Sequence, residues 1–212
     1  MDIQTFKNFP PITRTYLLIS ILANFLCFAQ IVKPIHLFLN FQLIIYHFNF
    51  WRIFSHAFFF GQIGLKAFFY IFFFSRYSKA LESYSFQGKK EDYLYLLIFG
   101  NSIMLLFKIF IVEAQFLGPA ITNMVVYLWG KKNAQQQINL INILHIRGSS
   151  LPFVLTLSSL LLKQKTLKLD IIGIIAGHLY YYLEEIYPRL IGGQKVLKTP
   201  FFFEIIFSKE KP

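Results

Sequence analysis

Apolar runs alternate with shorter polar segments along most of the chain, and this pattern predicts an all-α membrane protein. A helix needs about 20 apolar residues to cross the hydrocarbon core of a bilayer. Most of the runs approach this length, and we expect six transmembrane helices from them. The predicted spans cover residues 15–32, 57–74, 93–112, 118–130, 151–162 and 170–189.

The fourth run, residues 118–130, is short for a helix that meets lipid on all sides. A short central helix that is surrounded by the other spans would explain this length. A bilayer responds to a mismatch in length partly by deformation of its lipids. We therefore expect a locally thinned membrane near this helix.

Polar segments between the runs indicate the loops. Residues 35–56 mix polar residues with aromatic and aliphatic ones, which is typical of an amphipathic loop in the membrane interface. Residues 75–92 are the most polar interior segment, and we expect them to lie in water. Residues 131–147 form another polar loop, part of which we expect to be a surface helix. We expect one membrane domain over residues 1–190 and a short basic tail over residues 191–212.

The last predicted span carries Gly173 and Gly177 four residues apart, followed by His178. The two glycines share one helix face and allow close approach of a neighbouring backbone, so this face is suited to packing against another helix. An imidazole inside a membrane needs a partner or water, which makes His178 a candidate functional residue. Gln62 and Asn123 also interrupt apolar runs. These three residues are candidates for lining a polar cavity, and hydrogen bonding between helices is the alternative.

Composition and charge agree with a membrane protein. Of the 212 residues, 56% are hydrophobic and 15% are charged, and the mean hydropathy is +0.52. A net charge of +11 would suggest nucleic-acid binding in a soluble chain, but here the basic residues lie between apolar runs. Most of them fall on the side that carries both termini, which the positive-inside rule places in the cytoplasm.

Few side chains are arranged for metal or redox chemistry. Cys27 is the only cysteine, so no intrachain disulfide can form. The five histidines lie on different segments without the spacing of metal ligands. We therefore expect neither a metal site nor a cofactor.

Trp51 and Arg52 lie near the end of the predicted first loop. Trp is typical of the interfacial belt of membrane proteins, and Arg can reach a phosphate or a carbonyl group, so a simple anchor is one interpretation. The order of several short segments supports a second one. The Trp-Arg pair in a long first loop, followed by FFFGQIG, FSRYSKALE, LGPAITNMVVYLWGKKN and GIIAGHLYYYLEE…LKTPFF, resembles the Derlin family of rhomboid-like pseudoproteases.

The resemblance extends over residues 6–203 and implies a rhomboid-like fold of six transmembrane helices in the membrane of the endoplasmic reticulum or a derived membrane. It implies no proteolysis, but help in extracting misfolded proteins across a locally thinned membrane during endoplasmic-reticulum-associated degradation. Trp51 and Arg52 match the family's motif in the first loop, and Gly173 and Gly177 match its GxxxG motif. We expect these four residues to bind partners or substrates, or to stabilise the fold.

The partners that the resemblance implies are a membrane ubiquitin ligase, a cytosolic AAA ATPase, misfolded substrates, the lipid bilayer, and further copies of this chain or of related chains. Many relatives carry a longer tail with a short glycine- and aromatic-rich box that binds the ATPase, whereas this sequence stops at Pro212. We therefore expect a tail-bearing partner to recruit the ATPase. No nucleic acid is expected among the partners.

Two other functions remain as alternatives. An intramembrane serine protease would need a serine in a Gly-x-Ser-Gly segment at the start of the fourth span and a histidine base on the sixth. The corresponding segment, residues 118–121, reads Gly-Pro-Ala-Ile and has no serine. Ser158 and Ser159 lie at a depth similar to that of His178, but polar contacts between helices are the simpler explanation. A transporter or channel would predict an internal repeat or a continuous charged pathway, and neither is evident.

Overall fold

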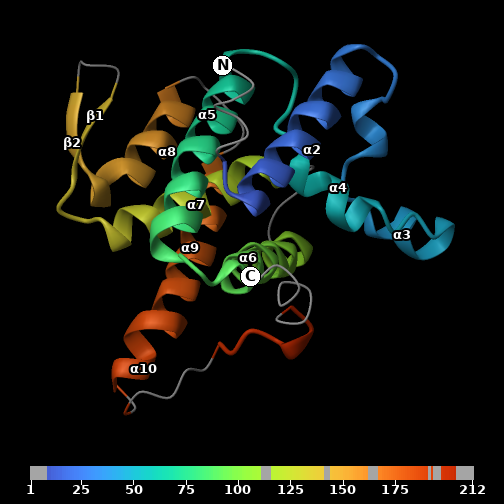
Figure 1. The fold of residues 1–212 in the computed structure, drawn as a ribbon. Helices are drawn as coiled ribbons and strands as arrows, with labels where there is room; N and C mark the ends of the chain where they lie inside the picture. The colour runs from blue at the N-terminus through green and yellow to red at the C-terminus, as the bar shows by residue number, and fades with distance from the viewer. Residues whose placement is uncertain are drawn as a thin grey trace.

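The computed structural model describes residues 9–110, 116–140, 144–161, 167–190, 192 and 197–203, and these residues are mostly helical (Figure 1). The longer helices are α2 (Pro11–Phe28), α5 (Leu65–Ala80), α6 (Lys90–Phe110), α7 (Gly118–Lys132), α8 (Leu151–Leu161) and α9 (Leu167–Tyr181). A single π turn follows α5 and another follows α9, at Leu81–Ser85 and Tyr182–Ile186, and α10 (Tyr187–Leu190) ends this last stretch.

Helix α7 lies at the centre of the fold. All of its residues from Gly118 to Gly130 are buried, and it contacts α4 (Arg52–Phe58), α5, α6, α8 and α9. A helix of 15 residues is about 22 Å long. The prediction of a short fourth helix that is surrounded by others is therefore confirmed.

The lengths and hydropathy of the described helices do not by themselves give six membrane spans. Among the described helices, α2 is the one whose length and hydropathy alone suffice to cross a bilayer. Helix α6 has 21 residues but carries charged side chains in its first turn and near its end, and α7 and α8 are shorter, with 15 and 11 described residues. Six spans therefore stay a proposal.

Polar contacts between α2 and the end of α5 correct two sequence predictions. Helix α2 begins at Pro11, four residues before the predicted start. Glu82 accepts hydrogen bonds from the backbone N–H groups of Ile12 (2.9 Å) and Thr13 (2.7 Å) and from the Thr13 hydroxyl (2.6 Å). Glu82 and Ser78 are both buried. The prediction that residues 75–92 lie in water is therefore wrong for this part, because these side chains bind the first turn of α2.

The loop before α5 is longer than predicted. It contains a short 3-10 helix (Pro34–His36), α3 (Phe41–His47) and α4 (Arg52–Phe58). Residues 57 and 58, which were expected to open the second span, belong to α4, and α5 begins only at Leu65. Gly61 adopts a φ of 100° in the bend between α4 and α5, a conformation that favours glycine.

A β-hairpin replaces the surface helix that was expected in residues 131–147. Strands β1 (Gln137–Leu140) and β2 (Leu144–Arg147) pair in antiparallel orientation, with Ile138 opposite Ile146. Ile138 is buried, Ile146 packs on the core, and the residues flanking them are exposed. The all-α prediction is therefore wrong here, because the sequence alternates apolar and polar residues with the period of a strand.

Helix α2 ends at Phe28, four residues before the predicted end of the first span, and α5 continues to Ala80, six residues beyond the predicted end of the second. Helices α7 and α8 begin at the predicted residues, while α6 and α9 each begin three residues early. The predicted ends of the third and fifth spans, residues 111–112 and 162, fall outside the described residues. Part of the basic tail lies against α6, where the Thr199 hydroxyl donates a hydrogen bond to Asp92 and the rings of Phe203 and Tyr95 are 6.4 Å apart.

Candidate functional site

Helices α7 and α9 meet backbone to backbone at the glycine pair. A Cβ atom on Gly173 would lie only 2.2 Å from the carbonyl oxygen of Ala120, and one on Gly177 would lie 3.1 Å from that of Met124. The close packing expected of this glycine face is thus observed, with α7 as the neighbour. A role of the two glycines in binding partners stays a prediction.

A buried polar cluster lies beside this contact, centred on Asp170 in the first turn of α9. One carboxylate oxygen accepts hydrogen bonds from the Asn123 amide of α7 (2.7 Å) and the Tyr70 hydroxyl of α5 (2.9 Å). Tyr70 is also hydrogen-bonded to Ser159 of α8 at 2.9 Å. Asp170 and Asn123 are completely buried. One side chain from each of four helices therefore joins a single network.

This cluster was largely missed in the sequence. Asn123 was a candidate, but Asp170 was interpreted only as the start of a span. The sequence does contain a signal for this cluster, because Asp170 lies one turn before Gly173 in an apolar stretch. An ionisable residue inside a membrane is rare and needs a partner. The second carboxylate oxygen of Asp170 and the amide oxygen of Asn123 have no hydrogen-bond partner among the described residues.

The three candidate cavity residues lie in different surroundings. Asn123 is buried in the cluster, whereas His178 and Gln62 are exposed. The His178 ring is hydrogen-bonded through Nδ1 to the Tyr127 hydroxyl at 2.7 Å. Gln62 lies in the bend before α5. The structure therefore does not bring these residues together, and contact of any of them with a substrate stays a prediction.

A protease site would need a serine paired with a histidine, and the described residues at the positions considered for it are arranged differently. Ala120 occupies the position of the expected serine and faces Gly173. Ser159 is hydrogen-bonded to Tyr70 and to a carbonyl of its own helix, and the side chain of Ser158 lies outside the described part. Within the described residues, no serine hydroxyl is paired with His178.

Arg52 holds the first loop together from inside. Its side chain is only 4% exposed, and one guanidinium nitrogen donates to the carbonyl oxygens of Ile35 (2.7 Å) and Phe38 (2.9 Å). The guanidinium also lies over the Phe38 ring at 5.3 Å. Of the two roles considered for Arg52, phosphate contact or carbonyl contact, the geometry supports the carbonyl.

Trp51, the neighbour of Arg52, is instead 55% exposed. Several large apolar side chains of the same loop are also exposed, namely Ile45, Tyr46, Phe48, Phe50 and Phe54. Exposed aromatic and aliphatic side chains at this density are typical of a surface that contacts a membrane. The Trp-Arg pair thus combines an outward aromatic residue with an inward structural cation.

Two contacts fix the first loop to α6. The Lys108 ammonium donates to the carbonyl oxygen of Leu39 at 2.8 Å, and His56 is hydrogen-bonded to Asn101 at 3.3 Å and to the Arg52 carbonyl at 2.7 Å. Burial lowers the pKa of His56 and the charge of Lys108 lowers it further, against the opposing effect of its two hydrogen bonds. The pKa of His56 therefore lies below its usual value, with burial as the largest cause.

Replacing Arg52 with alanine is expected to loosen the first loop. Two carbonyl groups would lose a charged donor, and hydrogen bonds of this kind contribute about 1.5–3 kcal/mol. Amide hydrogen exchange in residues 34–47 should rise roughly tenfold or more. Arg76→Ala is the control, because Arg76 is exposed and its described contact is with the Tyr77 ring. Equal exchange in the two variants would contradict the structural role of Arg52.

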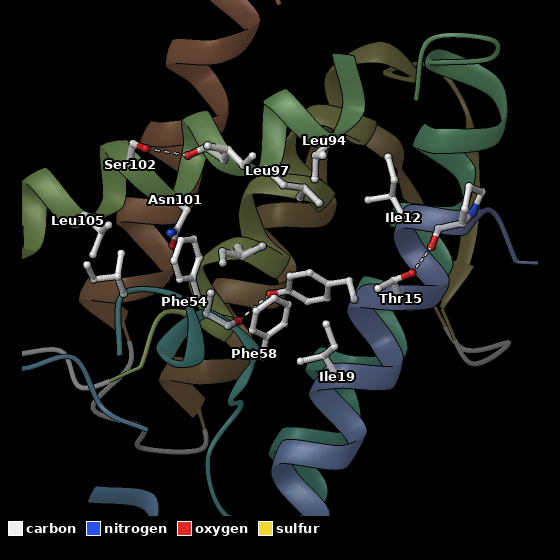
Figure 2. A pocket seen from close by; sticks show the side chains of 16 residues that line it. Ile12, Thr15, Ile19, Phe54, Phe58, Leu94, Leu97, Asn101, Ser102 and Leu105 are labelled. Atoms are coloured by element: carbon white, nitrogen blue, oxygen red, sulfur yellow. Dashed lines mark hydrogen bonds between the residues drawn. The ribbon is translucent and has the colours of Figure 1, made fainter. Parts of the chain in front are cut away.

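An apolar groove of about 480 Å³ lies between α2, α4 and α6 (Figure 2). Ile12 and Ile19 come from α2, Leu97 and Leu105 from α6, and Phe54 from α4. Most of its lining atoms are aliphatic or aromatic carbon, so the groove is suited to an apolar ligand.

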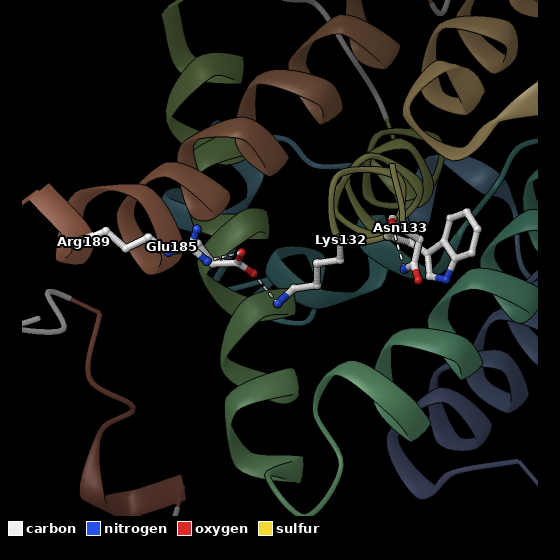
Figure 3. Close-up of polar contacts among 5 residues, drawn as sticks. Lys132, Asn133, Glu185 and Arg189 are labelled. Atoms are coloured by element: carbon white, nitrogen blue, oxygen red, sulfur yellow. Dashed lines mark hydrogen bonds and ion pairs between the residues drawn. The ribbon is translucent and has the colours of Figure 1, made fainter. Parts of the chain in front are cut away.

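An ion-pair network joins the C-terminal end of α7 to the π turn after α9, which carries Glu185, and to α10 (Figure 3). The Lys132 ammonium lies 2.5 Å from one carboxylate oxygen of Glu185, and Arg189 lies 3.8 Å from the other. Lys132 belongs to the last turn of α7, where a cation also interacts favourably with the helix dipole. The α7–α9 region is thus held by polar contacts at both ends.

The described residues contain no group of three His, Cys, Asp or Glu side chains that could hold a metal ion.

Comparison with known proteins identifies the family. The model of the Der1-like family matches residues 9–201. A probable derlin-2 homolog of Dictyostelium discoideum is 34% identical over 98% of this chain and 84% of its own length. Derlin-2.1 of Zea mays and Derlin-2.2 of Arabidopsis thaliana are also 34% identical over 98% of this chain, covering 86% and 88% of their own lengths. The chain therefore belongs to the Der1-like family.

Proposed function

We propose that this protein is a non-catalytic membrane factor of endoplasmic-reticulum-associated degradation, which helps misfolded proteins to return across the membrane. It would do so by thinning the bilayer locally and by binding substrates and partners. Membership of the Der1-like family supports the role in degradation. In this proposal the protein lies in the membrane of the endoplasmic reticulum or a derived membrane, with both termini in the cytoplasm.

The observation that carries the proposal is the short central helix. Six helices, α2 and α5 to α9, would cross the membrane with α7 in their middle. The 15 residues of α7 extend about 22 Å, whereas the hydrocarbon core of a typical bilayer is about 30 Å thick. Because α7 is buried, the mismatch would act on lipid through its exposed neighbours, such as α8, whose 11 described residues include the exposed Phe153 and Leu157. Lipids next to such a bundle would deform to reduce the mismatch.

A thinner bilayer lowers the cost of moving a polar chain. Each unsatisfied backbone group costs several kcal/mol in hydrocarbon, so a shorter hydrocarbon path reduces the number of groups that are exposed to it at one time. The exposed apolar side chains of the first loop, including Trp51, would lie in the interface and support the same deformation.

The residues at the protease positions support a function without catalysis. A serine nucleophile needs a nearby base, and Ala120 stands where a rhomboid protease would be expected to carry that serine. The methyl group of alanine can neither attack an amide nor be activated by a histidine. Extraction of substrates would then depend on partners, which we propose to be a membrane ubiquitin ligase and a cytosolic AAA ATPase that supplies the energy.

Crosslinking followed by affinity purification from native membranes tests these partners. We expect a membrane ubiquitin ligase and an AAA ATPase to be recovered with the full-length chain, and not with an unrelated tagged protein of the same membrane. Recovery of neither would contradict the proposal. Labelling of the protein by a serine-directed activity probe would instead favour the intramembrane protease.

A further inference from the structure

Residues 197–203, which we call the tail segment, are held to α6 by contacts of two kinds (Figure 1). The polar contact is the hydrogen bond that the Thr199 hydroxyl donates to a carboxylate oxygen of Asp92. The apolar contacts are made by Leu197, which packs on the hydrophobic core, and by Phe203, which lies against Tyr95. A surface segment with so short a contact area opens locally at a low free-energy cost. The Thr199 hydroxyl is therefore a polar anchor that becomes accessible whenever the tail segment opens.

The surroundings of Thr199 are acidic. A small pocket of about 240 Å³ lies there, and its walls include Asp92 of α6 and Glu184 of the π turn after α9. Among the described residues that line this pocket, Lys198 is the one with a positive charge, and it belongs to the tail segment itself. The electrostatic attraction between the tail segment and the helices therefore depends on the charge of Lys198 relative to two carboxylates.

Thr199 is followed directly by Pro200, and this pair occurs once in the sequence. The chain has eight prolines, and none of the others follows a serine or a threonine. One class of protein kinases selects its serine or threonine by the proline after it. Lys198 and Pro200 are exposed, Thr199 is half-buried, and residues 198–200 belong to no helix or strand. The pair thus lies in an irregular surface segment, which is the usual place for a modification.

We propose that Thr199 is a phosphorylation site and that its phosphorylation releases the tail segment from α6. The inference goes beyond the proposed function and uses its cytoplasmic placement of the C-terminus, because a kinase and ATP are present on that side. In the reaction the Thr199 oxygen forms a bond to the γ-phosphorus of ATP, while the bond between this phosphorus and the β,γ-bridging oxygen breaks. ADP leaves, and the hydroxyl proton passes to a base of the kinase.

The phosphate reverses the electrostatics of this contact. A phosphothreonine carries a charge of about −1.5 to −2 at pH 7. Its ester oxygen no longer carries the proton that Thr199 donates to Asp92. The added charge also exceeds that of Lys198, so the tail segment becomes negative beside Asp92 and Glu184. A phosphate placed next to carboxylates disrupts a contact by repulsion between like charges.

Treatment of the purified full-length protein in detergent with ATP and a proline-directed kinase, whose activity is verified on a Thr-Pro peptide, tests the proposal. We expect mass spectrometry to find a phosphate on Thr199, and none in Thr199→Val. Amide hydrogen exchange in residues 197–203 should rise roughly tenfold or more, as expected when a hydrogen bond to a charged group is lost. Exchange in the central helix α7 should stay the same, because the membrane domain remains folded.

Two variants separate the added charge from the lost hydrogen bond. Thr199→Val removes the hydrogen bond without adding charge, so it should raise the exchange of the tail segment less than phosphorylation does. Asp92→Asn replaces one of the two carboxylates by an amide that can donate to a phosphate, so phosphorylation should raise exchange by a smaller factor in this variant.

Two results would overturn the proposal. One is that the active kinase leaves Thr199 of the protein unmodified. The other is that the phosphorylated and the unmodified protein exchange equally in residues 197–203. Both concern the tail segment alone, so either of them would leave the proposed role in degradation intact.

Discussion

Replacing Gly173 with alanine is expected to force α7 and α9 apart and to lower the stability of the membrane domain by about 3 kcal/mol. The added methyl carbon would lie 2.2 Å from the carbonyl oxygen of Ala120 and 3.0 Å from its carbonyl carbon. Both contacts are with backbone atoms at the centre of the fold, so no side chain can rotate away. Unfolding of the purified protein in detergent, followed by intrinsic fluorescence, measures the loss.

Two other glycines provide a graded control. Gly177→Ala should cost less, because its nearest contacts are 3.1 Å from the added carbon. Gly64→Ala should be close to neutral, because its nearest neighbour is 4.0 Å away and its backbone is extended. The three variants should therefore rank in the order 173, 177, 64. Equal stability of all three would show that α7 and α9 do not meet through the glycine face.

Replacing Glu82 with alanine is expected to have an effect of similar size, about 3 kcal/mol, through the first turn of α2. The carboxylate is the acceptor for two backbone N–H groups and one hydroxyl, and each buried group left unpaired costs about 1–3 kcal/mol. Faster proteolysis of the N-terminal segment around Ile12, together with a lower unfolding midpoint, should reveal the loss of this cap.

Two further variants refine the test. Glu82→Gln keeps an acceptor oxygen but loses the charge, and should lie between the wild type and alanine. Glu91→Ala removes a half-buried carboxylate from the first turn of α6 and is the control for charge alone. If Glu91→Ala destabilised the protein as much as Glu82→Ala, net charge rather than capping would be responsible.

The sequence predicted the central helix well because its signals are local. Gly118 and Pro119 mark the start of α7, since proline at the beginning of a helix needs no N–H partner. The thirteen residues from Gly118 to Gly130 contain no charged side chain and are all buried, which is the pattern of a helix surrounded on all sides. The glycine pair on α9 likewise indicated a close neighbour before that neighbour was known.

Contacts between distant residues account for most of the errors. Glu82 and Thr13 are 69 positions apart, and no local pattern indicates that one caps the helix of the other. Without this contact, residues 75–92 have the composition of a solvated loop. Arg52 is a similar case, because its carbonyl partners are defined only by the fold of the first loop.

Two other errors had signals that were present in the sequence. Around Ile138 and around Ile146, apolar and polar residues alternate with the period of a strand. The polar composition of the whole segment favoured a loop or a surface helix instead. Asp170 was assigned to the boundary of a span, although a carboxylate next to a glycine-rich helix face is a candidate for a buried hydrogen-bond network.

The central claim, that this protein lowers the barrier for a misfolded chain to leave the membrane without cleaving it, is tested most directly by reconstitution. Vesicles with and without the protein would contain a fluorescent misfolded substrate, and its extraction by an external unfolding ATPase would be timed while its length is followed by electrophoresis. We predict faster extraction of the intact substrate from vesicles that contain the protein. Equal rates in both kinds of vesicle, or a shortened substrate, would contradict the account.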